Sequence, residues 1–213
     1  MFKILMLPVI FLTCILQVDA QRIRHYNLVQ LLNKDKLLTT PSQETRILSD
    51  AVQKEAISTK GIVWLKNVSF SKGTIEVDLR GKNIFLQSFL GIAFHGVDSI
   101  AYDALYFRPF NFRHEDTLRR KWSVQYFSMP DYDYVRLRQE HPLVYENAVT
   151  PVPNPDDWFH ATIVITKDSV MVYVNHSNTA SLKVKLLNNR NTGNIGLWTS
   201  ALSGDFANLS LIP

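Results

Sequence analysis

Cysteine is almost absent from this sequence. The 213 residues contain a single one, Cys14, and it lies within the first twenty. The rest of the chain therefore has no disulfide, no thiol nucleophile and no cysteine ligand for a metal. About 190 residues are enough to fold without such cross-links, because a chain of this length buries roughly 70% of its unfolded surface. We predict a protein that is held together by its hydrophobic core.

Long apolar runs are missing too, apart from one at the start. Lys3 precedes a mostly apolar run that ends at Leu16, and Val18-Asp19-Ala20 offers compact residues for signal peptidase. The run is shorter than the ~20 apolar residues that a membrane span needs. We predict a cleaved signal peptide over residues 1–20, a secreted or periplasmic mature chain, and no integral membrane segment after cleavage. A lipoprotein anchored at Cys14 is the less favoured alternative, because "FLTC" is a poor lipobox.

No block of one charge sign stands out. The net charge is +4, and the basic residues alternate with acidic ones, as in "RHEDTLRRK". A nucleic-acid-binding surface shows a clustered basic stripe, so we predict no nucleic-acid partner. The sequence also lacks a Gly-x-Ser-x-Gly elbow, a glycine-rich phosphate loop and histidine pairs at zinc-ligand spacing. These absences argue against serine hydrolases and nucleotide-binding enzymes, and we predict no zinc site.

Short strand-like segments dominate what remains. In "GTIEVDLRG" the apolar Ile75, Val77 and Leu79 alternate with charged residues between two glycines, which is typical of a half-buried strand. Later segments repeat this character: "FLGIAFHG", "ALYFRPF", "KWSVQYFS", "FHATIVIT", "VMVYVNH", "SLKVKLL", "NIGLWTS" and "FANLSLI". Evenly spaced strands with polar turns predict an all-β sandwich or barrel of antiparallel sheets.

Three regions interrupt the strand pattern. Residues 42–58 have a weak helical pattern, although a sandwich would place early strands there, so both interpretations stay open. Residues 114–120 form a predicted charged loop. Prolines at 151, 153 and 155 cannot join a ladder and predict an extended surface connection that leads to Trp158. With no repeat and no linker, we predict one domain over residues 21–213.

Several of these segments together resemble a known group. "VSFSKGTIEVDLRG" near the start and "GNIGLW" with "GDFANLSL" near the end are similar to exported domains of the concanavalin A-like lectin/glucanase superfamily. They are similar in particular to bacterial domains described as laminin G-like or 3-keto-disaccharide hydrolase-like. The resemblance covers the chain from about Gly61 onward. It implies a jelly-roll sandwich of two antiparallel sheets, with the first and last strands adjacent and ligands on the concave face.

The same resemblance bears on metals and on catalysis. Such domains often bind calcium through loop carboxylates, and Asp131, Asp133, Asp156 and Asp157 are available for it, although no loop holds a complete ligand set.

Family 16 glycoside hydrolases carry Glu-x-Asp followed by a second Glu on one strand. This chain has Glu76 and Asp78 but then Leu79-Arg80-Gly81, so that second glutamate is missing.

Glu76 and Asp78 are nevertheless site candidates. Residues two apart on a strand point to the same face, and their Cα atoms are about 6.6 Å apart. That is close to the separation of the two catalytic carboxyl groups in glycosidases. We expect Arg80 to pair with Asp78 and keep it ionised, which suits binding or structure better than acid catalysis.

The stretch from Tyr106 to Gln125 supplies further candidates. Tyr106, Arg108 and Phe110 share one face of a strand, opposite Leu105 and Phe107, and Pro109 suggests that this strand lies at an edge or contains a bulge. In "KWSVQYFS" we expect Val124, Tyr126 and Trp122 to face the core and Gln125 to face the ligand side. Arg136 and Arg138 are secondary candidates on this part of the chain.

Three more residues complete the candidate set. Trp158 follows the proline connection, where a sugar ring can stack on it. His95 and His160 both lie in predicted strands, and either is a candidate to line the concave face, although a strand histidine is more often a hydrogen-bonded bystander. We expect the candidates to gather on one hollow face.

Three functions fit these observations. The favoured one is an exported carbohydrate-binding module without catalytic activity, which combines aromatic stacking with a few placed polar groups. The alternative is a glycoside hydrolase-type enzyme that acts on keto-disaccharides or oligosaccharides. The third is a protein-interaction module of the laminin G-like kind.

Overall fold

The computed structural model describes residues 22–39, 43–50 and 52–213. The predicted signal peptide, its cleavage site and Cys14 lie outside these ranges. Within them, no helix combines the length and apolar character needed to cross a bilayer.

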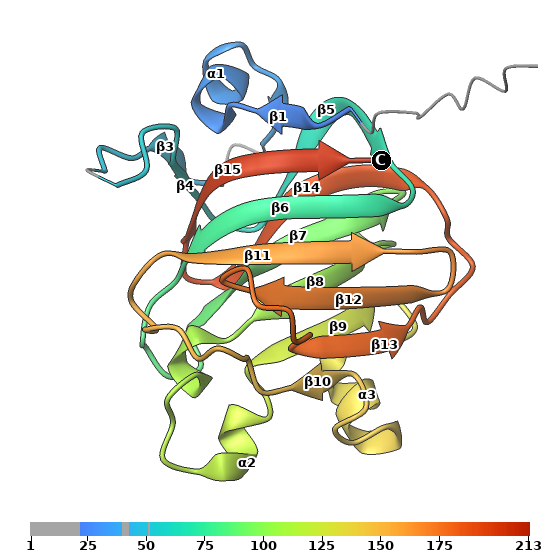
Figure 1. Ribbon diagram of the computed structural model, residues 1–213. Coiled ribbons are helices and arrows are strands. Elements are labelled where there is room, and N and C mark those ends of the chain that lie inside the picture. The colour runs from blue at the N-terminus through green and yellow to red at the C-terminus, as the bar shows by residue number, and fades with distance from the viewer. Residues whose placement is uncertain (1–21, 40–42, 51) are drawn as a thin grey trace, which may run out of the picture.

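Two antiparallel sheets form the two layers of the fold (Figure 1). Sheet A has the strand order β13-β12-β11-β6-β15-β4-β3, and β1 also pairs with β15. Its strands are β1 (Arg24–Tyr26), β3 (Thr45–Ile47), β4 (Ile57–Thr59), β6 (Gly73–Arg80), β11 (Phe159–Ile165), β12 (Ser169–Val174), β13 (Leu182–Lys185) and β15 (Gly204–Ile212). The pairing of β1 with β15 brings the first and last strands of the described chain together, as expected for a jelly roll.

Sheet B has the strand order β10-β9-β8-β7-β14-β5-β2. Its strands are β2 (Leu37–Leu38), β5 (Ile62–Phe70), β7 (Ser88–Gly96), β8 (Asp103–Phe107), β9 (Val124–Ser128), β10 (Glu146–Asn147) and β14 (Gly193–Ala201). Short helical segments connect or cover the strands: α1 (Leu28–Asn33), η1 (Pro109–Asn111), α2 (Thr117–Arg120) and α3 (Tyr134–Glu140). This arrangement confirms the predicted all-β jelly-roll sandwich.

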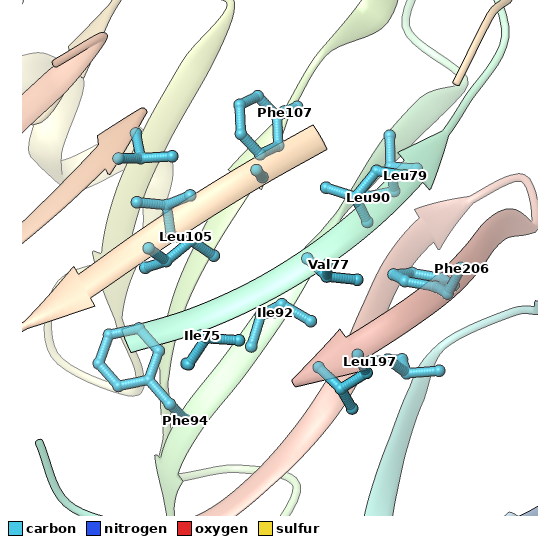
Figure 2. Packing of buried hydrophobic residues seen from close by; sticks show 14 of the residues in the cluster. Ile75, Val77, Leu79, Leu90, Ile92, Phe94, Leu105, Phe107, Leu197 and Phe206 are labelled. Carbon is cyan, nitrogen blue, oxygen red and sulfur yellow. The ribbon is translucent and has the colours of Figure 1, made fainter. Parts of the chain in front are cut away.

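The main core lies between the two sheets and follows from period-two alternation. Ile75, Val77 and Leu79 of β6 are fully buried, while the residues between them point out of the sandwich. The inward side chains of β6 lie against those of β7 and β8 (Figure 2). A one-residue slip of any of these strands would expose its apolar set, so the core fixes the register.

Several local predictions need correction. Of the two interpretations left open for residues 42–58, the described residues bear out the early strands, because they contain β3 and the start of β4. The strand that contains Tyr106 is not at an edge, because β8 lies between β7 and β9 and ends at Phe107, before Pro109 begins η1. Val124 and Tyr126 face the core as expected, but Trp122 precedes β9 and is only half buried. The charged loop at 114–120 contains the short helix α2.

The central position of β7 gives a test of the core. Replacing the fully buried Ile92 by Ala should lower the free energy of unfolding by about 2–5 kcal/mol, because lost burial and a residual cavity add. The exposed Ile84→Ala variant should change it by less than about 0.5 kcal/mol. Urea unfolding of both variants measures the difference, and equal values would contradict the sandwich core.

Candidate functional site

A row of residues crosses the outer face of sheet B. The register aligns Trp198 of β14 with Gly91 of β7, Gly91 with Tyr106 of β8, and Tyr106 with Gln125 of β9. The row then continues from Gln125 to Glu146 of β10. All these positions are out of phase with the core residues of their strands, so they share one face.

Gly91, which lies between Trp198 and Tyr106, is the one residue of this row without a side chain. A Cβ atom there would lie 2.1 Å from the carbonyl oxygen of Leu105, so any side chain would collide with the neighbouring strand. Its two register neighbours, Tyr106 and Trp198, have ring centroids 5.0 Å apart. Phe127 adds a third ring, 5.5 Å from each of them. These rings make an aromatic floor on the outside of the sheet.

A polar cluster continues the row beyond Tyr106. The Tyr106 hydroxyl donates to Gln125 Oε1 at 2.7 Å. Arg108 Nη2 donates to the same hydroxyl and to Gln125 Oε1. Arg108 Nη1 donates to the carbonyl of Trp122 at 2.7 Å and lies 3.5 Å from Glu146 Oε2. Tyr106, Arg108, Gln125 and Glu146 are all nearly fully buried.

Helix α3 brings a second guanidinium to this cluster. Asp133 caps the helix by accepting from the Arg136 amide, and Leu137 anchors it on the outer face of sheet B. Figure 1 shows α3 beside β10. Arg138 then reaches Glu146 with two donors, Nε at 3.1 Å and Nη2 at 2.7 Å. Its guanidinium also stacks over Trp122, 4.3 Å from the ring centre.

Burial sets the charge states in the cluster. It raises the pKa of Tyr106 to about 12, so this phenol is neutral near pH 7 and can donate its proton to Gln125. Burial also lowers the pKa of Arg108 below its usual value. For Arg138 burial acts in the same direction, but the ion pair with Glu146 outweighs it and the pKa is raised.

A cleft of about 460 Å³ opens over the aromatic floor and the polar cluster. Its lining consists of aromatic, apolar and cationic side chains with one serine: Leu86, Phe89, Tyr106, Arg108, Phe127, Tyr134, Arg138, Trp198, Ser200 and Ala201. The size and the mixture of rings with a few fixed polar groups are typical of a small-molecule site.

The sequence-based candidates divide between several places. Tyr106, Arg108 and Gln125 meet at the cleft. Glu76 and Asp78 do not, because they point outward from β6 in the other sheet, so the expectation of one shared face is wrong for them. Phe127 and Trp198 line the cleft as well, and the buried Glu146 joins the polar cluster beside it. Of these three, only Phe127 follows directly from the alternation that places Gln125 outward.

Asp78 is engaged in a network on sheet A. Its carboxylate accepts from His160 Nδ1 at 2.7 Å, from Gln53 at 2.9 Å and from Asn208 at 2.6 Å. Burial by itself would raise the pKa of Asp78, but these hydrogen bonds outweigh it and lower the pKa. The expected partner, Arg80, instead pairs with Asp50 at 2.7 Å and Asp205 at 2.9 Å. An ionised, fully hydrogen-bonded carboxylate is poorly suited to donate a proton.

Glu76 and Asp78 line a separate polar groove of about 620 Å³ on sheet A. His160 also lines it and stacks on His176, with ring centroids 4.2 Å apart. His25 lines the same groove and is hydrogen-bonded to Ser210 at 2.8 Å.

The remaining two candidates lie away from both places. His95 is fully buried; its Nε2 is 2.6 Å from the carbonyl oxygen of Ser71, and its Nδ1 is 3.3 Å from Asp103. Trp158 stacks on Arg80 at 4.6 Å and donates to Asp50 at 3.3 Å, so it covers the Arg80 ion pairs.

Three of the four loop carboxylates considered for calcium accept hydrogen bonds from protein groups. Asp133 caps α3, Asp156 accepts from the Asn83 amide, and Asp157 accepts from Asn154. Across residues 22–39, 43–50 and 52–213, no group of three or more histidine or carboxylate side chains is arranged to hold a metal ion.

Comparison with known proteins supports the fold and no closer relationship. The chain matches no protein-family model, and no curated protein matches it in sequence. It is similar in structure to a carbohydrate-binding module, CBM66, from Bacillus subtilis, with 14% identity, a TM-score of 0.54, and coverage of 79% of this chain and 94% of that one. A Bacillus subtilis protein of unknown function with a galectin-like fold is 12% identical, with a TM-score of 0.57 and coverage of 89% and 94%.

These similarities agree with the concanavalin A-like sandwich that the sequence predicts. At such low identity they concern the fold alone.

The buried carboxylate of Glu146 gives a test of the cluster. Glu146→Ala leaves two guanidiniums without their shared partner and should lower the free energy of unfolding by about 3 kcal/mol. Glu140→Ala removes the exposed pair between α3 residues Arg136 and Glu140 and should cause little measurable change. Urea unfolding compares the two, and a Glu146 variant as stable as the Glu140 variant would contradict the cluster.

The Asp78 network gives a test against pH. Because the pKa of Asp78 is lowered on folding, its contribution to stability is present above the unfolded value of about 3.9 and is lost as pH falls through the folded pKa. Unfolding free energies below about pH 4 should therefore decline less steeply with acidification in Asp78→Asn than in the unmodified protein. The exposed Asp131→Asn variant is the control. Identical slopes in all three proteins would contradict the network.

Proposed function

We propose that this chain is an exported saccharide-binding module that binds its ligand in the cleft of sheet B without cleaving it. The observation that carries the proposal is the aligned row from Trp198 through Gly91 and Tyr106 to Gln125 and Glu146. It sets flat aromatic surface beside fixed hydrogen-bonding groups.

Saccharides need this combination. A sugar ring has apolar C–H faces that pack on aromatic rings and hydroxyl groups that need directed partners. The Tyr106, Phe127 and Trp198 rings offer the first, and the Arg138 guanidinium at the cleft wall offers donors for the second. The similar fold of a protein described as a carbohydrate-binding module is in keeping with the proposal.

The non-catalytic part of the proposal rests on the carboxylates. Glycoside hydrolysis needs two carboxyl groups on either side of one bond. Glu76 and Asp78 lie on sheet A, and Glu146 is buried and shared by two arginines. Incubation of the purified protein with keto-disaccharides and oligosaccharides tests this part, and any cleavage product that is lost in Asp78→Asn would overturn it in favour of the hydrolase alternative.

Export and a single folded unit belong to the same proposal. We place the signal peptide at residues 1–20 and the mature domain at 21–213. N-terminal sequencing of the protein recovered from secreting cells should begin at Gln21. A lipidated N-terminus at Cys14 would instead assign a membrane-anchored form.

The location of the site is testable with two tryptophans on opposite sheets. Trp198→Ala should weaken saccharide binding at least about tenfold, because it removes one of the three rings of the aromatic floor. Trp158→Ala should leave affinity unchanged, because Trp158 covers ion pairs on sheet A. Calorimetric titration of a saccharide identified by glycan array measures both, after circular dichroism confirms that each variant is folded. A larger loss in the Trp158 variant would place the site elsewhere.

A further inference from the structure

We infer that the cleft of sheet B selects saccharides that carry an anionic group, a carboxylate or a sulfate, over neutral ones. The inference rests on the proposed function and concerns the ligand class of the same site.

The first step is the charge of the cluster. Arg108 and Arg138 share one carboxylate, that of Glu146, which lies 3.5 Å from Arg108 Nη1 and 2.7 Å from Arg138 Nη2. One positive charge is therefore left over. Glu146 is buried beneath the guanidiniums, and the residues that line the cleft include both arginines and no carboxylate.

The second step is the supply of free donors. A guanidinium has five N–H donors. Arg138 uses one on Nε and one on Nη2 for Glu146, and no described residue accepts from the other three. Arg108 is already committed to Tyr106, Gln125, Trp122 and Glu146. Arg138 is thus the residue that meets the ligand, and Arg108 positions the groups beneath it.

The third step is accessibility and orientation. The side chain of Arg138 is 34% exposed, whereas that of Arg108 is 5% exposed. Its guanidinium is held between Glu146 and the face of Trp122, so its remaining donors have a defined direction before a ligand arrives. A planar, pre-oriented guanidinium is the side chain best suited to carboxylate and sulfate oxygens.

The fourth step is the surrounding medium. The cleft beside Arg138 is walled by Phe127, Tyr134 and Trp198. Apolar walls weaken screening, so an uncompensated cation there attracts an anionic group more strongly than an exposed lysine would. A neutral sugar would also displace water from Arg138, but its hydroxyl groups accept weaker hydrogen bonds from the guanidinium than carboxylate or sulfate oxygens do. The difference between the two ligand classes is therefore expected to be large.

Paired ligands test the inference. Calorimetric titration compares oligogalacturonate and oligoglucuronate with their carboxyl-reduced forms, and a sulfated galactan oligosaccharide with its desulfated form. We expect at least one anionic member to bind at least about tenfold more tightly than its neutral partner, and this preference to shrink as salt rises from about 0.05 to 0.5 M. The pair that shows it distinguishes carboxylate from sulfate.

Variants on α3 assign the preference to one residue. Arg138→Gln should bring the ratio of anionic to neutral affinity close to one while the protein stays folded, and Arg138→Lys should restore part of it. Arg136→Gln, two residues away on the outer side of α3 and paired with Glu140, should leave the ratio unchanged.

The outcomes separate the two proposals. Equal affinity for neutral and anionic partners, or a uniform loss for both in Arg138→Gln, would overturn the anionic preference and leave saccharide binding standing. Absence of binding to every member of a broad neutral and anionic panel would overturn both.

Discussion

The packing of two sheets on a shared core is the constraint from which the rest of the structure follows. Each central strand must present its apolar alternate residues inward, and this requirement leaves no freedom in which residues face outward. On β7, burial of Leu90, Ile92 and Phe94 places Gly91 outside. On β8, burial of Leu105 and Phe107 places Tyr106 outside. The outer row that crosses sheet B is a geometric consequence of the inner packing.

The two outer faces of the sandwich have different chemistry. On sheet A the outward Asp78 and Arg80 of β6 are each held in a polar network with residues from neighbouring segments. On sheet B the outward residues include large rings, which pack together as a second apolar cluster. An apolar outer face is costly unless something covers it, and here α3 covers part while the cleft leaves part open. That asymmetry, more than the fold, distinguishes the candidate binding face.

The buried ion cluster depends on α3. Arg108 directly follows β8, Glu146 comes from β10, and Arg138 comes from a helix of seven residues between β9 and β10. Leu137 fixes the helix on the sheet, and the next residue along the chain is the arginine that reaches Glu146. One short connection therefore covers the apolar face and supplies charge to the cleft wall.

Local pattern was sufficient for the fold class and for part of the site. Alternation in "GTIEVDLRG" and "VQYFS" identified strands, the inward positions of Val124 and Tyr126, and the outward position of Gln125, because strand geometry has a period of two whatever lies around it. The same rule correctly paired Tyr106 with Arg108 on one face. It could not say which sheet a strand joins, so it grouped Glu76 and Asp78 with residues that belong to the opposite layer.

Only the tertiary structure decided which outward residues meet. Glu146 lies 38 residues from Arg108, and Trp198 lies 96 residues from Tyr102, whose hydroxyl accepts its indole N–H. Such partners are set by strand order and by the path of α3, which depend on long-range pairing rather than on neighbours in the chain. The sequence by itself determined an all-β chain with a period-two core and a set of spare polar groups. The order of strands in two sheets determined that Tyr106, Arg108, Gln125 and Glu146 form one hydrogen-bonded cluster beside the cleft, while Asp78, His95 and Trp158 lie elsewhere.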